Sequence, residues 1–213
     1  PPRQELVKQK DYAKKILENN IGIPVINFNG YEADDIIGSL SNIYSQESGD
    51  EITIVSPDKD LFQLVKKNVN ILRPFKNKTG RGYDFVTERG VEDTFGVPPH
   101  LISDFLALMG DVSDNLPGVD KVGAVTAAKL LKKYNSLEHL IAISHEIKGL
   151  LGENIRGAIP TLMTVKELTK VKIDLPLSDI VNLAVEKAIE IQGSHAYKQN
   201  MHDMRGFFNW YPN

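Results

Sequence analysis

Apolar residues recur along the chain with two different periods. In the first half, short β-branched runs alternate with segments in which apolar residues fall three or four positions apart. The runs predict strands at residues 23–28, 51–56 and 69–73, and the spaced segments predict helices at residues 2–19, 32–44 and 59–65. Because strands that alternate with helices form parallel βαβ units, this half is predicted to be an α/β core with a parallel sheet.

The second half shows helical spacing with short breaks. Helices are expected at residues 87–95, 99–109, 123–134, 136–142 and 157–170, and again from Asn182 until a tail begins. The polar segment 74–83 reads as a loop or hairpin, and Pro176 makes the extended segment 171–177 an edge or non-strand element. We expect a single domain over 1–213, with an α/β core (1–110), a helical region (111–180) and a C-terminal helix and tail (181–213).

Composition narrows the class of protein. Hydrophobic residues make up 41% of the 213 positions, which is enough for a sizeable core. The absence of cysteine excludes disulfides and thiolate metal sites and fits a reducing compartment. No apolar run approaches the roughly 18 residues of a membrane span, and no signal-peptide pattern opens the chain. The composition therefore predicts a soluble protein.

The net charge of −3 hides a strong separation of charge. Residues 30–60 hold eight acids and one lysine, whereas residues 61–83 hold six basic residues and no acid. Residues 115–134 hold four lysines and one acid. Each segment alone fits a solvated surface equally well, but together they favour an acidic site beside basic surfaces that suit nucleic acid.

Carboxylates follow two of the predicted strands. Glu32, Asp34 and Asp35 come after the strand at 23–28, while Asp58 and Asp60 come after the strand at 51–56. Acids at the first turn of a helix commonly only cap it. Five acids at one sheet edge, with Lys59 alone to offset them, favour a hard divalent cation, Mg²⁺ or Mn²⁺.

Two further acids, Asp111 and Asp114, enter after the helix at 99–109. Because seven carboxylates exceed what one Mg²⁺ uses, the sequence predicts two ions that clamp a phosphodiester during attack by water.

The segment LPGVDKVG (116–123) predicts a tight turn that feeds a helix rich in small residues. Gly118 and Gly123 flank the turn, and Lys121, Lys129, Lys132 and Lys133 supply positive charge. Backbone amides at such a turn bind phosphate without reading sequence. A plain helix-turn-helix corner with a solvated lysine face is the alternative. Because the segment 116–123 lies close in sequence to Asp111 and Asp114, we favour the interpretation that it binds the duplex backbone at a fixed distance from the metal-binding acids.

The motifs GYEADDIIGSL, TIVSPDKDLFQLV and LMGDVSDNLPGVDKVGAVTAAKLLKKYNSLEHL resemble the 5′ nuclease family, that is, the 5′→3′ exonuclease domain of bacterial DNA polymerase I and related flap endonucleases. The resemblance runs from Pro1 to about residue 177. It implies a parallel-sheet, PIN-like α/β core and a helix–three-turn–helix region that binds duplex DNA.

The resemblance also implies roles for the candidate residues. It makes Glu32 and Asp34 ligands of a first metal, with Asp34 bridging, and Asp58, Asp60 and Asp114 the second-metal group, while Asp35 and Asp111 are supporting or water-mediated ligands. It implies that DNA is bound by the hairpin and the helix after it, through Gly118, Val119, Lys121, Val122, Gly123, Thr126 and Lys129. The carbonyls of Val119 and Val122 would hold K⁺.

Family members begin with a strand ending in Asp and then carry an arch segment, whereas this chain resembles a member entered after the arch. The expected activity is hydrolysis of 5′ ends or flaps of DNA in replication and repair, by a monomer working with a DNA polymerase, without a membrane partner. The expected location is the cytoplasm (nucleoid) in a bacterium, or the nucleus or an organelle in a eukaryote. Two alternatives stay open: a catalytically silent binder of DNA junctions, and a related nuclease acting on RNA.

Overall fold

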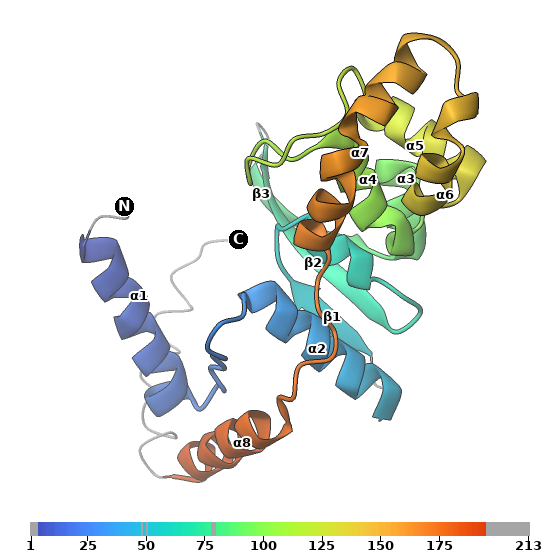
Figure 1. The fold of residues 1–213 in the computed structure, drawn as a ribbon. Helices are drawn as coiled ribbons and strands as arrows, with labels where there is room; N and C mark the ends of the chain where they lie inside the picture. Colours follow the sequence, from blue (N-terminus) through green and yellow to red (C-terminus); the bar gives the residue numbers. More distant parts are fainter. Residues whose placement is uncertain (1–3, 48, 50, 78–79, 195–213) are drawn as a thin grey trace. The chain divides into compact units, whose positions relative to one another are not determined.

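The computed structural model describes residues 4–47, 49, 51–77 and 80–194, which belong to two compact units (Figure 1). One unit comprises residues 1–36 with 175–213, and the other comprises residues 37–174. The predicted tail, from residue 195 onward, lies outside the described residues. The three-part division of the chain expected from sequence stays a prediction.

The first unit is helical. It contains α1 (Gln4–Ile16), a π-helical turn η1 (Leu17–Ile21), the first turn of α2 (Ala33–Glu47) and α8 (Ser178–Gly193). Gly22 ends the first helical segment in the left-handed conformation, with φ of +68°, and its carbonyl accepts a hydrogen bond from Gln192 Nε2 at 2.8 Å. The predicted helix near 2–19 and its glycine stop are confirmed, and the helix expected from Asn182 begins four residues earlier.

The predicted strand at 23–28 is wrong. These residues form neither a strand nor a helix in the part of the chain that the structure describes, and Ile23 is 45% exposed. A β-branched run forms a strand only where a neighbouring strand supplies hydrogen bonds and packing.

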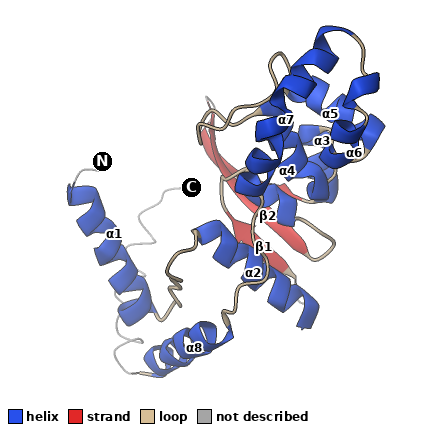
Figure 2. Ribbon diagram, viewed as in Figure 1, coloured by secondary structure: helices blue, strands red, loops and turns tan. Residues whose placement is uncertain are grey.

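The sheet belongs to the second unit and is mixed (Figure 2). Its three described strands lie in the order β1 (Ile52–Val55), β2 (Val69–Asn77) and β3 (Gly80–Val86). β1 and β2 pair in parallel, with Ile54 opposite Ile71, whereas β2 and β3 form an antiparallel hairpin. The α/β class is confirmed, but the sheet is not wholly parallel, because the polar segment 74–83 pairs as a hairpin.

Helices follow the hairpin, as the sequence predicts. They are α3 (Glu88–Phe95), η3 (Pro99–Leu101), α4 (Ile102–Met109), α5 (Ala124–Tyr134), α6 (Leu137–Ala142), η4 (Ser144–Glu146) and α7 (Gly149–Thr169). The short 3₁₀ helix η2 (Asp60–Leu64) lies before the hairpin, between β1 and β2. α7 begins eight residues before the expected start. Burial of Ile155 and its neighbours extends the helix through a glycine-containing stretch with weak intrinsic propensity. Residues 171–177 form neither a strand nor a helix, in line with the expected non-strand position, but Leu177 at the end of the segment is in the αR region and is not extended.

One hydrophobic core joins the sheet and the helices of the second unit. It reaches from Ile54 on β1 to Leu162 on α7. The rings of Phe62, Phe95 and Phe105 are in contact in series, with centroids 5.3 and 5.7 Å apart. This core fixes the loops after β1 and after α4, which carry the candidate site. No helix among the described residues is both long and apolar enough to cross a membrane.

Candidate active site

Three carboxylates that are distant in sequence meet in the second unit. Asp60 begins η2 after β1, Asp111 directly follows α4 and its cap Gly110, and Asp114 lies in the next turn. One oxygen of each lies within 4.8 Å of the others. Of the seven acids considered from sequence, the structure groups these three; we call them the acidic cluster.

A short hydrogen-bonded loop holds Asp111. Its amide donates to the Leu116 carbonyl at 2.9 Å, and the Leu116 amide donates to the Asp111 carbonyl at 2.8 Å. The amide and the hydroxyl of Ser113 both donate to Oδ1 of Asp111, at 2.9 and 2.5 Å. The Asp111 side chain is only 3% exposed, so these bonds fix its orientation inside the protein. Asp114, on the same loop, is exposed.

The backbones of Gly110 and Gly118 approach each other closely, and this contact packs the loop against the end of α4. Gly110 has φ of +79°, and a Cβ on Gly118 would lie 2.4 Å from the carbonyl carbon and oxygen of Met109. No side chain fits there. The Val119 amide donates to the Leu108 carbonyl at 2.9 Å and continues the attachment. The geometry therefore gives Gly118, which the sequence places at a tight turn, a packing role, and its contact with phosphate stays a prediction.

Lys59 provides positive charge beside the cluster. Its ammonium forms an ion pair with Oδ2 of Asp111 and donates to the Ser113 hydroxyl at 3.2 Å. Burial alone would lower the pKa of Lys59, but the hydrogen bond to Asp111 and the charges of Asp111, Asp60 and Asp114 outweigh it and raise that pKa. Lys59 is therefore held in its charged form.

The acids of the cluster respond differently to their surroundings. Burial raises the pKa of Asp60 to about 6, and the charges of Asp58, Asp111 and Asp114 add to this. Burial would also raise the pKa of Asp111, but hydrogen bonds from Lys59 and Ser113 hold it well below its usual range. A hydrogen bond with Asp111, together with that residue's charge, raises the pKa of Asp114. Negative charge is thus crowded here.

A hard cation fits this arrangement. Oδ1 of Asp60 is buried and has no hydrogen-bond partner. A buried carboxylate oxygen without a partner is costly, and a cation removes the cost. All three side chains supply oxygen ligands, which Mg²⁺ and Mn²⁺ prefer. Asp60, Asp111 and Asp114 are therefore suited to hold a divalent ion.

Asp58 lies outside this group of three. Its side chain is exposed, and its Oδ1 accepts the Asp60 amide at 3.1 Å, while the Asp58 amide donates to the Ser56 hydroxyl at 3.1 Å. Its charge nevertheless contributes to the raised pKa of Asp60. Asp58 shapes the turn after β1, and its predicted role as a ligand stays a prediction.

The other predicted ligands lie at the start of α2, in the first unit. Glu32 is exposed, and its carbonyl accepts the Ile36 amide at 3.3 Å. Asp34 and Asp35 occupy the first turn and are half-buried. Acids in a first helical turn favour the helix by themselves. That these three residues meet the acidic cluster stays a prediction.

The hairpin after Asp114 presents backbone and lysine side chains. Val119 and Val122 are buried and anchor it, and the Val122 amide donates to the Val119 carbonyl at 3.0 Å. Lys121, with φ of +61°, and Gly123 are exposed at the tip and at the start of α5. On α5, Thr126 is half-buried and Lys129 exposed. The first amides of a helix lack carbonyl partners, so this end of α5 suits a phosphate group.

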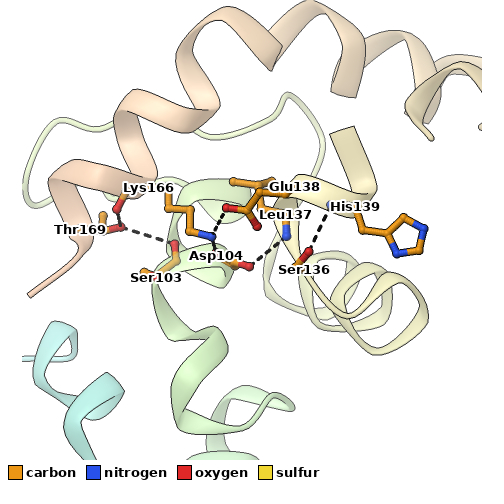
Figure 3. A network of polar contacts seen from close by, with 8 residues as sticks. All are labelled: Ser103, Asp104, Ser136, Leu137, Glu138, His139, Lys166 and Thr169. Atoms are coloured by element: carbon orange, nitrogen blue, oxygen red, sulfur yellow. Dashed lines mark hydrogen bonds and ion pairs between the residues drawn. The ribbon is translucent and has the colours of Figure 1, made fainter. Parts of the chain in front are cut away.

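A second charged group lies between α4, α6 and α7 (Figure 3). Lys166 pairs with Asp104 at 2.6 Å and with Glu138 at 2.5 Å. The other oxygen of Asp104 accepts the Leu137 amide at 2.9 Å, at the start of α6, where Ser136 also caps the helix. We call Asp104, Lys166 and Glu138 the helix triad.

Sequence reasoning missed several of these residues. It noted Lys59 only as a charge, and it overlooked Ser113 and the helix triad. The Asp-x-Ser spacing at 111–113 was an available signal, because an Asp side chain commonly binds the amide two residues on. The triad joins residues up to 62 positions apart and has no local signal.

Comparison with known families decides the classification. The family model described as "5'-3' exonuclease, N-terminal resolvase-like domain" matches residues 1–96, and the one described as "5'-3' exonuclease, C-terminal SAM fold" matches residues 97–190. The chain belongs to the 5′-3′ exonuclease family. The resemblance seen in the sequence motifs is thereby confirmed.

Curated members of this exonuclease family are similar over most of the chain. A 5′-3′ exonuclease of Buchnera aphidicola (subsp. Schizaphis graminum) is 39% identical over 171 residues, which are 77% of this chain and 57% of the relative. DNA polymerase I of Synechocystis is 37% identical over 82% of this chain and 18% of its own length. A 5′-3′ exonuclease of Aquifex aeolicus is 46% identical over 56% of this chain and 39% of its own. The chain therefore spans little more than half of these relatives at most.

Solved structures show the same fold. A mutant of T5 5′-exonuclease superposes with a TM-score of 0.65 at 19% identity, covering 94% of this chain and 75% of that protein. The catalytic core of Rad2, solved with a DNA substrate, superposes with a TM-score of 0.52 at 16% identity, covering 90% of this chain and 70% of that one. At these identities the likeness establishes the fold of the exonuclease family.

Proposed function

We propose that the chain is the metal- and duplex-binding part of a structure-specific 5′ nuclease, which hydrolyses DNA phosphodiesters at 5′ ends or flaps with two divalent ions. The observation that carries the proposal is the acidic cluster: three converging carboxylates, one with a buried oxygen that has no partner. A glycine hairpin suited to phosphate follows the cluster after three residues. Family membership supports the same reading.

Each group has a part in this proposal. Asp60, Asp111 and Asp114 hold one divalent ion, while Asp58 supports them, and Glu32, Asp34 and Asp35 serve the other ion. Ions bound there would polarise the scissile phosphate and lower the pKa of a bound water. The hairpin and α5 hold the duplex backbone through amides and through Lys121 and Lys129, with K⁺ on the carbonyls of Val119 and Val122. This binding reads phosphate and not base sequence.

The relatives support a proposal for the substrate, partner and location of the enzyme. T5 flap endonuclease and Rad2 were solved with DNA, and T5 5′-exonuclease was also solved with zinc. By analogy, the partner is DNA with a 5′ flap or end, processed by a monomer beside a DNA polymerase. The bacterial relatives favour a cytoplasmic location at the nucleoid.

Cleavage of an end-labelled 5′-flap duplex tests the proposal, with Mg²⁺, Mn²⁺ or chelator, for the chain alone and for the chain extended by the upstream segment of a family member. We expect cutting that needs a divalent ion and is lost, by at least about 100-fold, in Asp60→Asn with DNA binding retained. Asp93→Asn, an exposed acid on α3, is the matched control. Binding without cleavage in every form would instead indicate a DNA-junction binder.

A further inference from the structure

Lys59 has an unusual position among the acids of the candidate site. It lies between Asp58 and Asp60 in sequence, and its side chain crosses to the loop after α4, where it contacts Asp111 and Ser113. The side chain is 31% exposed, so its ammonium group has a path to solvent. Asp111, its partner, has no such path because it is 3% exposed.

The balance of charge around Lys59 is uneven. The negative charges of Asp58, Asp60, Asp111 and Asp114 act on one another. The positive charge of Lys59 interacts with Asp60, Asp111 and Asp114. Within the described ranges, Lys59 is the only cation in an ion pair with any of these four acids. It therefore stabilises the cluster in the absence of another cation.

We propose that Lys59 is a built-in competitor of the divalent ion: it neutralises Asp111 in the metal-free protein and must leave the cluster when the metal binds. This inference rests on the proposed function, because it concerns the metal that the cluster would hold. An ammonium group and a divalent ion repel each other across the few ångströms of this site. The lysine stem is flexible and partly exposed, whereas Asp111 is fixed by Ser113, so Lys59 is the group that moves.

The lysine consequently weakens metal binding while it protects the empty site. Removing its charge takes away the competitor, so binding of a divalent ion becomes tighter by about tenfold. The same change leaves the buried Asp111 without its counter-charge, so the metal-free protein becomes less stable. A residue that merely positioned Asp111 for the metal would have the opposite effect on affinity.

Calorimetric titration of Mn²⁺ into the full chain without DNA tests the inference. Lys59→Met, which keeps the length of the side chain, should bind Mn²⁺ about tenfold more tightly than the wild type. Lys59→Arg keeps the positive charge and should not bind Mn²⁺ more tightly than the wild type. Lys67→Met, an exposed lysine in the same unit, is the matched control and should also leave the affinity unchanged. Circular dichroism first shows that each variant is folded. Lys59→Gln replaces Lys59→Met if the latter does not fold.

The outcomes separate the two proposals. Unchanged or weaker Mn²⁺ binding by the charge-removing variant, with normal binding by the wild type, would overturn the role of Lys59 alone. Binding by the variant but not by the wild type would support it in its strongest form. Absence of saturable binding in both would overturn the metal centre and, with it, this inference.

Discussion

Asp104 and Asp111 are two buried aspartates of the same unit, each 3% exposed and each paired with a lysine, yet their surroundings differ. In the helix triad, Asp104 also accepts a backbone amide, and Glu138 shares the lysine. Two acids meet one cation there and the polar atoms are paired. Around Asp111, three acids, Asp60, Asp111 and Asp114, interact with Lys59, and an oxygen of Asp60 has no hydrogen-bond partner.

The difference separates a structural ion pair from a site prepared for a ligand. The helix triad joins α4, α6 and α7, and its charges are paired with one another in two ion pairs. The acidic cluster keeps negative charge that the protein itself does not neutralise, and such uncompensated charge is typical of sites that bind a cation. Burial alone does not distinguish the two aspartates, because both are 3% exposed; the number of acids that crowd around each lysine does.

The largest effect is expected from breaking the triad. Lys166→Met leaves Asp104 buried without its counter-charge, which should lower the free energy of unfolding by about 3 kcal/mol. Urea unfolding followed by far-UV circular dichroism measures this. Lys170→Met, an exposed lysine near the end of α7, is the control and should stay within about 0.5 kcal/mol of the wild type. A loss of the same small size in Lys166→Met would show that the triad contributes nothing to folding.

A smaller loss is expected where the Asp111 loop meets α4. Gly118→Ala places a Cβ against the Met109 backbone and should cost about 1–3 kcal/mol, because backbone there cannot move aside easily. Gly157→Ala, in the open interior of α7, should instead stabilise the protein by about 0.5–1 kcal/mol. Thermal melting of both variants checks the contrast. Equal melting temperatures would contradict the packing of Gly118 against the Met109 backbone.

The smallest effect is a difference in pH response, measured in chelator. Folding raises the pKa of Asp60 from 3.8 to about 6, so the folded protein binds more protons between these values. Stability from Asp60 therefore decreases as the pH rises through that window. Folding lowers the pKa of Glu138, chiefly through the hydrogen bond from Lys166, so its contribution is present above 4.5 and is lost as the pH falls below this value.

Urea unfolding from pH 3.5 to 7 compares the wild type with Asp60→Asn and Glu138→Gln. Relative to Asp60→Asn, the wild type should gain stability as the pH falls from 7 to 4; relative to Glu138→Gln, it should lose stability below about 4.5. Parallel curves for the wild type and Asp60→Asn would mean that folding does not raise the pKa of Asp60.

Local signals explain most of the fold that was predicted correctly. Apolar spacing placed the helices to within a few residues except at the start of α7, and the glycine after η1 ended a helix as expected. The strand prediction for residues 23–28 is wrong because a strand needs a neighbouring strand to pair with, and the sequence of the segment does not show whether one is present. For the same reason, the sequence does not decide whether the segment 74–83 is a loop or a hairpin.

The sequence by itself determined the residue types of this protein: acids after a strand, a glycine turn before a helix, lysines on that helix, and the motifs of the 5′-3′ exonuclease family. Only the tertiary structure decided which acids meet. In the folded chain, Asp60 lies close to Asp111 and Asp114, and Lys59 forms an ion pair with Asp111. Asp104 instead forms an ion pair with Lys166 in the helix triad. The physical reason is that charge interactions act over a few ångströms, and packing of the core sets which distant residues come within that range.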